Sequence, residues 1–174
     1  MEPMKPQDSS EKILILLRHG ISQPLSHTLN DFNRSLTEQG ENAFCEKLEK
    51  MNSSHIFPQY NPQIIISSPS KRTHQTAQLF LCKQKLEIPL ETNMNLYEQT
   101  VKAIQTSIQQ SEKLVNSTKT ILIVAHNPLI ESWAYKVDPQ FKNSVTPGTF
   151  LFFKSSENSW KNAIENPWSL FLHV

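Results

Sequence analysis

Two histidines and two arginines of this sequence follow short apolar runs, at the points where buried strands would end. They are Arg18 and His19 after ILILL, Arg72 after IIISSPSK, and His126 after TILIVA. Two guanidinium forks make a strong receptor for a tetrahedral oxyanion such as phosphate. One imidazole can attack phosphorus while the other helps to neutralise the phosphoryl oxygens. These residue types therefore indicate phosphoryl transfer through a histidine.

Metal ligands of the usual kinds do not accompany these four residues. The sequence shows no carboxylate cluster that would suit magnesium, and its histidines have no cysteine neighbours of the kind used by zinc sites. We therefore predict chemistry that needs neither a metal nor another cofactor. Cys45 and Cys82 stand far apart and are expected to be buried or half-buried free thiols.

The order of apolar runs and helical patterns predicts the elements that must position these residues. Strands are expected at 13–17, 64–68 and 120–126 and over LEIPLE, TFLFFK and WSLFLHV, with helices at 36–51, 69–84, 101–115 and 127–137. This alternation predicts a three-layer α/β/α sandwich with a largely parallel sheet. Because parallel strands bring their carboxyl ends to one edge, the segments RHG, SSPSKR and AHNP are expected to form one site there.

Three of these segments also carry a family resemblance. In order and spacing, LLRHG, SSPSKRTHQTA and VAHNP resemble the histidine phosphatase superfamily, the phosphoglycerate mutase-like proteins, over roughly residues 13–135. RSLTEQG is similar to the family's stretch after the first loop, with Ser35 at the usual proline. The resemblance is to the small bacterial phosphohistidine phosphatases in particular, and it implies the phosphoglycerate mutase-like fold.

The resemblance implies a role for each of the four residues. His19 would be the nucleophile that becomes phosphorylated, Arg18 and Arg72 would clamp the phosphoryl oxygens, and His126 would be the second histidine of the pocket. Its implied general acid is a glutamate in a Leu-x-Glu stretch, which here is Glu98 in NLYEQT. The small bacterial phosphohistidine phosphatases often lack this acid, because the imidazole that leaves a phosphoramidate needs less help.

Four further residues are expected at the substrate. The backbone of Asn127 would lie close to the phosphate, and Gly20 would let the backbone approach it, because a side chain there would crowd the site. Ser22 could donate a hydrogen bond to the phosphate, although an ordinary loop hydroxyl is an alternative. Arg34 is one of only three arginines in the chain, beside fourteen lysines. It is expected to be structural or at the pocket rim.

Length and charge restrict the class of protein. The 174 residues suit one domain, expected over 12–174, with a flexible tail over 1–11. A net charge of +1 argues against nucleic-acid binding, because it leaves no basic excess to neutralise a phosphate backbone. The sequence has neither a signal peptide nor a stretch of transmembrane length, so no membrane association and a cytoplasmic location are expected. The oligomeric state stays open.

The combined expectation is a metal-independent phosphatase that acts on a phosphomonoester or on protein phosphohistidine through phospho-His19. Its partners would be a phosphorylated small molecule or a phosphohistidine protein. Two alternatives stay open: a phosphoglycerate mutase-like phosphotransferase, and a non-catalytic module that binds a phosphorylated ligand. The short segment between LYEQT and TILIVAH leaves room for little lid, which favours an open pocket over a buried mutase site.

Overall fold

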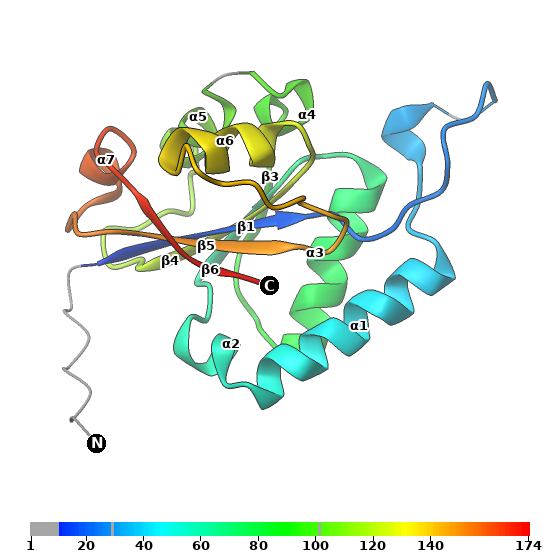
Figure 1. Cartoon of the computed structure of the whole chain (residues 1–174), viewed down its shortest axis with the longest axis horizontal. Coiled ribbons are helices and arrows are strands. Elements are labelled where there is room, and N and C mark those ends of the chain that lie inside the picture. The colour runs from blue at the N-terminus through cyan, green and yellow to red at the C-terminus, as the bar shows by residue number, and fades with distance from the viewer. Residues whose placement is uncertain (1–10, 29, 101) are drawn as a thin grey trace.

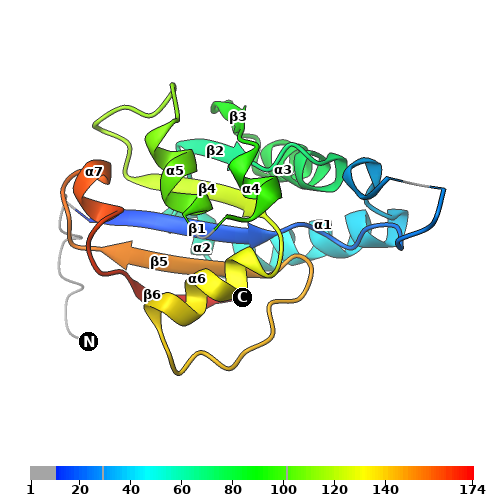
Figure 2. The same cartoon turned by 90° about the horizontal axis from the view of Figure 1, so that it is seen from above.

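Six strands form one mixed sheet in the computed structural model, which describes residues 11–28, 30–100 and 102–174. The strands are β1 (Lys12–Arg18), β2 (Ile64–Ser67), β3 (Leu90–Thr92), β4 (Thr120–Ala125), β5 (Phe150–Ser155) and β6 (Ser169–His173). Their order across the sheet is β3-β2-β4-β1-β5-β6 (Figure 2). The first four pair in parallel, whereas β5 is antiparallel to both β1 and β6. The predicted α/β class and largely parallel sheet are confirmed.

Helices cover both faces of this sheet. They are η1 (Asp31–Asn33), α1 (Glu38–Ser53), α2 (Ile56–Gln59), α3 (Lys71–Gln84), α4 (Asn95–Glu98), α5 (Ala103–Gln109), α6 (Leu129–Val137) and α7 (Trp160–Ala163). Figure 1 shows α1, α2 and α3 on one side of the sheet, with α4, α5, α6 and α7 on the other. The arrangement is the expected three-layer sandwich.

The continuous apolar run of β1 follows from this double cover. Leu14 and Leu16 pack in one core cluster with residues of α5 and α6, while Ile15 and Leu17 pack in a second cluster with residues of α1 and α3. Successive side chains of a strand point to opposite faces, so a strand covered on both sides needs apolar residues throughout. Arg18 ends the apolar run where the strand reaches the edge of the sheet.

The helix expected at 101–115 is shorter than predicted. Val101 lies outside the described residues, α5 ends at Gln109, and Val115 is exposed. Ile104 and Ile108 are buried, but the next positions on the same face are Ser111 and Glu112. A helix stripe without apolar residues has nothing to bury, so the helix is not extended by packing.

Three other expectations concern the chain ends, the cysteines and membranes. The expected tail over 1–11 lies outside the described residues apart from Glu11.

Cys45 and Cys82 are free, and Cys82 is exposed, so its expected burial was wrong. Among the described residues, no helix combines the length and the apolar character that crossing a bilayer requires.

Candidate active site

The carboxyl ends of β1, β2 and β4 meet at one edge of the sheet (Figure 2), as their parallel pairing requires. His19 follows β1, His126 follows β4, and Arg72 lies in the first turn of α3, which comes soon after β2. All three side chains are buried. The ring centroids of the two histidines are 5.2 Å apart. The structure therefore brings these predicted residues into one group.

The His19 ring is held in one tautomer. Its Nδ1 lies 2.7 Å from the carbonyl oxygen of Gly20, which can only accept, so Nδ1 carries the proton. Its Nε2 accepts a hydrogen bond from Nε of Arg72 at 3.2 Å. Burial, opposed by the Gly20 hydrogen bond and reinforced by the charges of Arg72 and Arg18, lowers the pKa of His19 to about 4. At neutral pH this histidine is uncharged, with a lone pair on Nε2.

Arg72 connects the two histidines. Besides its bond to His19, its Nη2 lies 3.3 Å from Nδ1 of His126, and its Nη1 donates to the backbone carbonyl of Asp31 at 2.6 Å. The Thr73 hydroxyl lies 2.7 Å from the carbonyl of Ser68, which ties the first turn of α3 to the end of β2. This turn holds the guanidinium at the sheet edge.

Both ring nitrogens of His126 are occupied. Nδ1 accepts from Arg72, so Nε2 carries the proton and donates to Oγ of Ser68 at 2.8 Å. Burial, followed by the positive charge of Arg72, lowers the pKa of His126 to about 3. This second histidine is therefore also neutral at physiological pH.

Asp31, at the start of η1, is part of the same network, and the sequence did not indicate it. Its Oδ1 pairs with Nη2 of Arg34 at 2.8 Å, and its Oδ2 pairs with Nη2 of Arg72 at 3.1 Å. The hydroxyl of Tyr97 donates to Oδ2 at 3.2 Å. Burial alone would raise the pKa of this carboxyl, but the hydrogen bonds and charges of Arg34 and Arg72 together lower it. Asp31 is therefore an anion held between two guanidinium groups.

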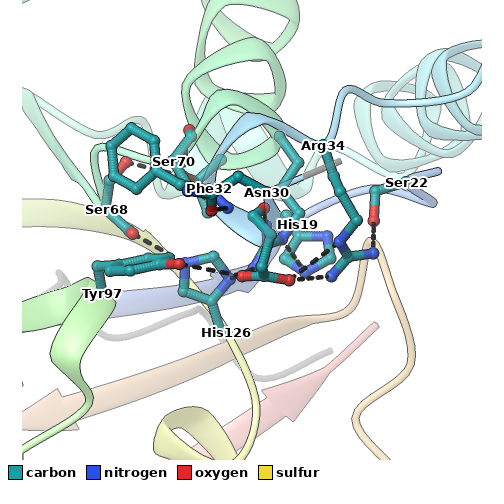
Figure 3. A network of polar contacts seen from close by, with 12 residues as sticks. His19, Ser22, Asn30, Phe32, Arg34, Ser68, Ser70, Tyr97 and His126 are labelled. Atoms are coloured by element: carbon teal, nitrogen blue, oxygen red, sulfur yellow. Dashed lines mark hydrogen bonds and ion pairs between the residues drawn. The ribbon is translucent and has the colours of Figure 1, made fainter. Parts of the chain in front are cut away.

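Figure 3 shows how this network extends from the histidines to the first loop. Arg34 donates to Oγ of Ser22 at 3.0 Å and to the carbonyl of Gln23 at 2.6 Å. The predicted rim residue Arg34 and the predicted substrate residue Ser22 thus bind each other. Ser22 as a direct phosphate ligand stays a prediction.

Arg18 is anchored to the segment before β5. Its Nη1 donates to the carbonyl of Val145 at 2.6 Å, and its Nε is buried without a hydrogen-bond partner among the described residues. The charge of Arg18 is close enough to lower the pKa of His19. Because this unpartnered donor is buried, an anion could bind it only after the Arg18 side chain or its surroundings move.

Local contacts explain why a glycine stands at position 20. Its N–H donates to Oγ1 of Thr76 at 3.0 Å, so this group is already occupied. A Cβ at this position would lie 3.3 Å from Cδ2 of Leu36. Gly20 therefore lets the chain that follows β1 pass close to Leu36, and its carbonyl orients the His19 ring. Its predicted approach to phosphate stays a prediction.

The remaining predicted residues lie at the margin of the group. Asn127 donates through Nδ2 to Oε1 of Glu131 at 2.7 Å and to the carbonyl of Val145 at 3.0 Å, which joins α6 to the segment before β5. Glu98 is exposed at the end of α4, without a side-chain partner among the described residues. The structure joins its neighbour Tyr97 to the site instead.

Sequence reasoning missed three members of the network, namely Asp31, Tyr97 and Ser68. Asp31 stands three positions before Arg34, the spacing of an ion pair on one helical turn, and this was the available signal. Tyr97 lies inside the Leu-x-Glu stretch that directed attention to Glu98. Nothing in the sequence marked Ser68 as the partner of His126.

The donors that line this site are mainly arginine and histidine nitrogens. Among residues 11–28, 30–100 and 102–174, no group of three or more histidine, cysteine, aspartate or glutamate side chains is arranged to hold a metal ion. The arrangement can bind a tetrahedral anion and present a neutral imidazole nitrogen to it.

Comparison with solved structures supports the fold. A protein assigned as phosphohistidine phosphatase SixA from Agrobacterium tumefaciens is 18% identical with a TM-score of 0.71, and the match covers 94% of this chain and 97% of that one. A protein histidine phosphatase SixA complexed with tungstate gives 15% identity, coverage of 93% and 96%, and a TM-score of 0.72. A phosphoglycerate mutase from Bacillus anthracis is 13% identical with a TM-score of 0.61, and the match covers 95% of this chain and 94% of that one.

Comparison of sequences finds no curated protein that matches this chain significantly, but it does find a family model. Residues 14–113 match the family model described as the histidine phosphatase superfamily (branch 1), and this range includes His19 and Arg72. More than half of the chain therefore carries the family's pattern, and the chain belongs to the histidine phosphatase superfamily.

Proposed function

We propose that this protein is a metal-independent phosphatase that works through a phosphohistidine intermediate on His19. The observation that carries the proposal is the state of the His19 ring. Its Nδ1 proton is held by the Gly20 carbonyl, and its unprotonated Nε2 faces the Arg72 guanidinium. A nucleophile needs such an unprotonated nitrogen next to the groups that hold its target, and the lone pair of Nε2 would be released when the Arg72 guanidinium turns to the phosphoryl oxygens.

The reaction takes two displacement steps. In the first, Nε2 of His19 forms a bond to phosphorus while the bond from phosphorus to the leaving group breaks and the leaving group takes up a proton. In the second, water attacks phospho-His19, the N–P bond breaks, and inorganic phosphate leaves. Arg18 and Arg72 would neutralise the phosphoryl oxygens in both steps, together with His126.

The proton for the first step is proposed to come from Glu98 when the leaving group is an alkoxide. Because the Glu98 side chain is exposed, it would have to turn toward the substrate. An imidazole leaving group needs less help from an acid, so hydrolysis of phosphohistidine would depend little on this residue.

Phosphohistidine or a simple phosphomonoester is the proposed substrate class. The segment from Gln99 to β4 carries one helix among its described residues, α5, so this segment supplies no long insertion over the site. A site without such an insertion suits a phosphorylated side chain on a protein. The fold similarity to SixA, a protein histidine phosphatase, points the same way.

The first test measures hydrolysis of an aryl phosphate and of a phosphohistidine protein with a chelator present. Wild type should turn over at least one of them, and His19→Asn should lose this activity. His55→Asn is the matched control, because His55 is exposed and outside the network. Rapid quench with radiolabelled substrate should trap an acid-labile phosphoryl group on wild type.

Other outcomes would point to the alternatives. Transfer of the phosphoryl group from a bisphosphate donor to a second substrate, in place of release to water, would indicate a mutase-like phosphotransferase. Tight binding of phosphorylated ligands without any turnover by wild type would indicate a binding module, and the phosphatase proposal would then be wrong.

A further inference from the structure

Asp31 is a charged residue beside the reacting groups that the two displacement steps do not use. Its Oδ2 lies 3.1 Å from Nη2 of Arg72, and the same nitrogen lies 3.3 Å from Nδ1 of His126. Nε of Arg72 reaches His19 at 3.2 Å. A single guanidinium therefore separates the Asp31 carboxylate from both histidines.

The Asp31 carboxylate lies on the solvent side of this guanidinium. Its side chain is 36% exposed, whereas that of Arg72 is 6% exposed. Both carboxylate oxygens accept hydrogen bonds, Oδ1 from Arg34 and Oδ2 from Arg72 and Tyr97. A carboxylate held by two guanidinium groups keeps its negative charge at neutral pH.

No other carboxylate of the described chain has this position. Of the carboxylates in the described residues, only that of Asp31 contacts Arg72, and the exposed Glu98 has no side-chain partner there. Glu131 accepts from the side chain of Asn127 and from the N–H of Val145, and it forms no bond to either histidine. A negative charge on the entry side of the phosphoryl position therefore comes from Asp31.

We propose that Asp31 is a specificity-determining residue that selects the leaving group by charge. The inference rests on the proposed function, because that function places a phosphoryl group among His19, Arg72 and His126. These three side chains are buried, so the rest of the substrate extends to the solvent side, where Asp31 lies. A second anionic group on the substrate would be repelled there, whereas a hydroxyl or an imidazole N–H could donate to the carboxylate.

Two substrates that differ by one carboxylate test this selection. Glycerol 3-phosphate and 3-phosphoglycerate share a three-carbon skeleton, but only the second carries a carboxylate. The measured quantity is the ratio of their kcat/KM values for wild type, Asp31→Asn and Asp31→Glu. Asp138→Asn is the matched control, because Asp138 lies at the end of α6 and its carboxylate accepts from the backbone of Gln140.

We expect wild type to prefer glycerol 3-phosphate. In Asp31→Asn the ratio of the two kcat/KM values should fall about tenfold, since the repulsion between charges a few ångströms apart is of this size. Asp31→Glu and Asp138→Asn should retain it. An unchanged ratio in Asp31→Asn would overturn the proposal. An equal loss of activity on both substrates would also overturn it, because Asp31 would then only position Arg72.

Failure of the proposed function would give a different result. In that case wild type would hydrolyse neither these substrates nor an aryl phosphate. The same ratio is then taken from dissociation constants measured by calorimetry with the two compounds. A ratio that shifts in Asp31→Asn would support charge selection in a binding protein, and one that does not shift would reject it.

Discussion

His126 donates from Nε2 to the hydroxyl oxygen of Ser68 at 2.8 Å, and both residues are buried. This bond leaves Nδ1 of His126 facing Arg72, which in turn contacts His19. The orientation of one histidine therefore depends on a serine hydroxyl at the end of β2. The dependence can be tested by removing the hydroxyl.

Ser68→Ala should lower both stability and activity. The substitution leaves the His126 N–H buried without an acceptor, which costs about 1–3 kcal/mol of unfolding free energy. It also frees the ring to turn away from Arg72. Urea unfolding and aryl phosphate hydrolysis measure the two effects. Ser67→Ala is the control, because the Ser67 hydroxyl donates to the Ser68 carbonyl and not to His126; an equal loss of activity in both variants would contradict the assignment.

An oxyanion should raise the pKa of both histidines. In the free protein the pKa is about 4 for His19 and about 3 for His126, chiefly because burial disfavours the charged rings. A bound tungstate dianion would favour the protonated rings. NMR titration of the ring nitrogens with and without tungstate measures the change, and the signals of exposed His55 serve as internal control. Unmoved titrations would show that the anion binds elsewhere.

The protein should lose stability as the pH falls below about 6.5. In the unfolded chain histidines protonate near the ordinary value of 6.5, but in the folded state His19 and His126 stay neutral until about pH 4 and 3. Between these values the unfolded state binds more protons, so acid favours unfolding. The slope approaches about 1.4 kcal/mol per pH unit for each histidine. Urea unfolding at pH 7, 6 and 5 measures it, and His126→Asn should show a smaller decline. Equal stability at pH 7 and 5 would contradict the neutral assignments.

Gly40→Ala should destabilise the protein more than Gly20→Ala. A Cβ on Gly40 would clash with the backbone oxygen of Ile21, so the loop that follows His19 would have to move. A Cβ on Gly20 would meet only the Leu36 side chain at 3.3 Å, which can shift. Overpacking against backbone costs about 1–3 kcal/mol or more. Denaturant unfolding of both variants gives the comparison, and the opposite order would contradict this account.

Glu98→Gln should slow hydrolysis of an alkyl phosphate about a hundredfold, the usual contribution of a general acid. It should leave phosphohistidine hydrolysis nearly unchanged, because imidazole leaves more readily. Glu87→Gln is the matched control at another exposed glutamate. An alkyl phosphate rate that is untouched in Glu98→Gln would refute the role of Glu98.

The sequence by itself determined that three residues of the site meet at the sheet edge. His19, Arg72 and His126 each follow an apolar run, and parallel strands bring such points together regardless of how the rest of the chain packs. The same local logic located the strands and the four longest helices, α1, α3, α5 and α6, but not the short helices α2, α4 and α7. It placed the end of α5 too late, because Val115 was counted in the apolar stripe although Ser111 and Glu112 interrupt it.

Only the tertiary structure decided how those residues are oriented and what surrounds them. The Gly20 carbonyl selects the tautomer of His19, and Ser68 selects that of His126. Asp31 reaches Arg72 across 41 positions of the chain, and Tyr97 reaches Asp31 across 66. Neither pairing has a sequence signal, because each depends on how the first loop and α4 pack over the sheet edge. The grouping of His19, Arg72 and His126 could thus be predicted from local pattern, whereas the charges placed around them depend on long-range packing.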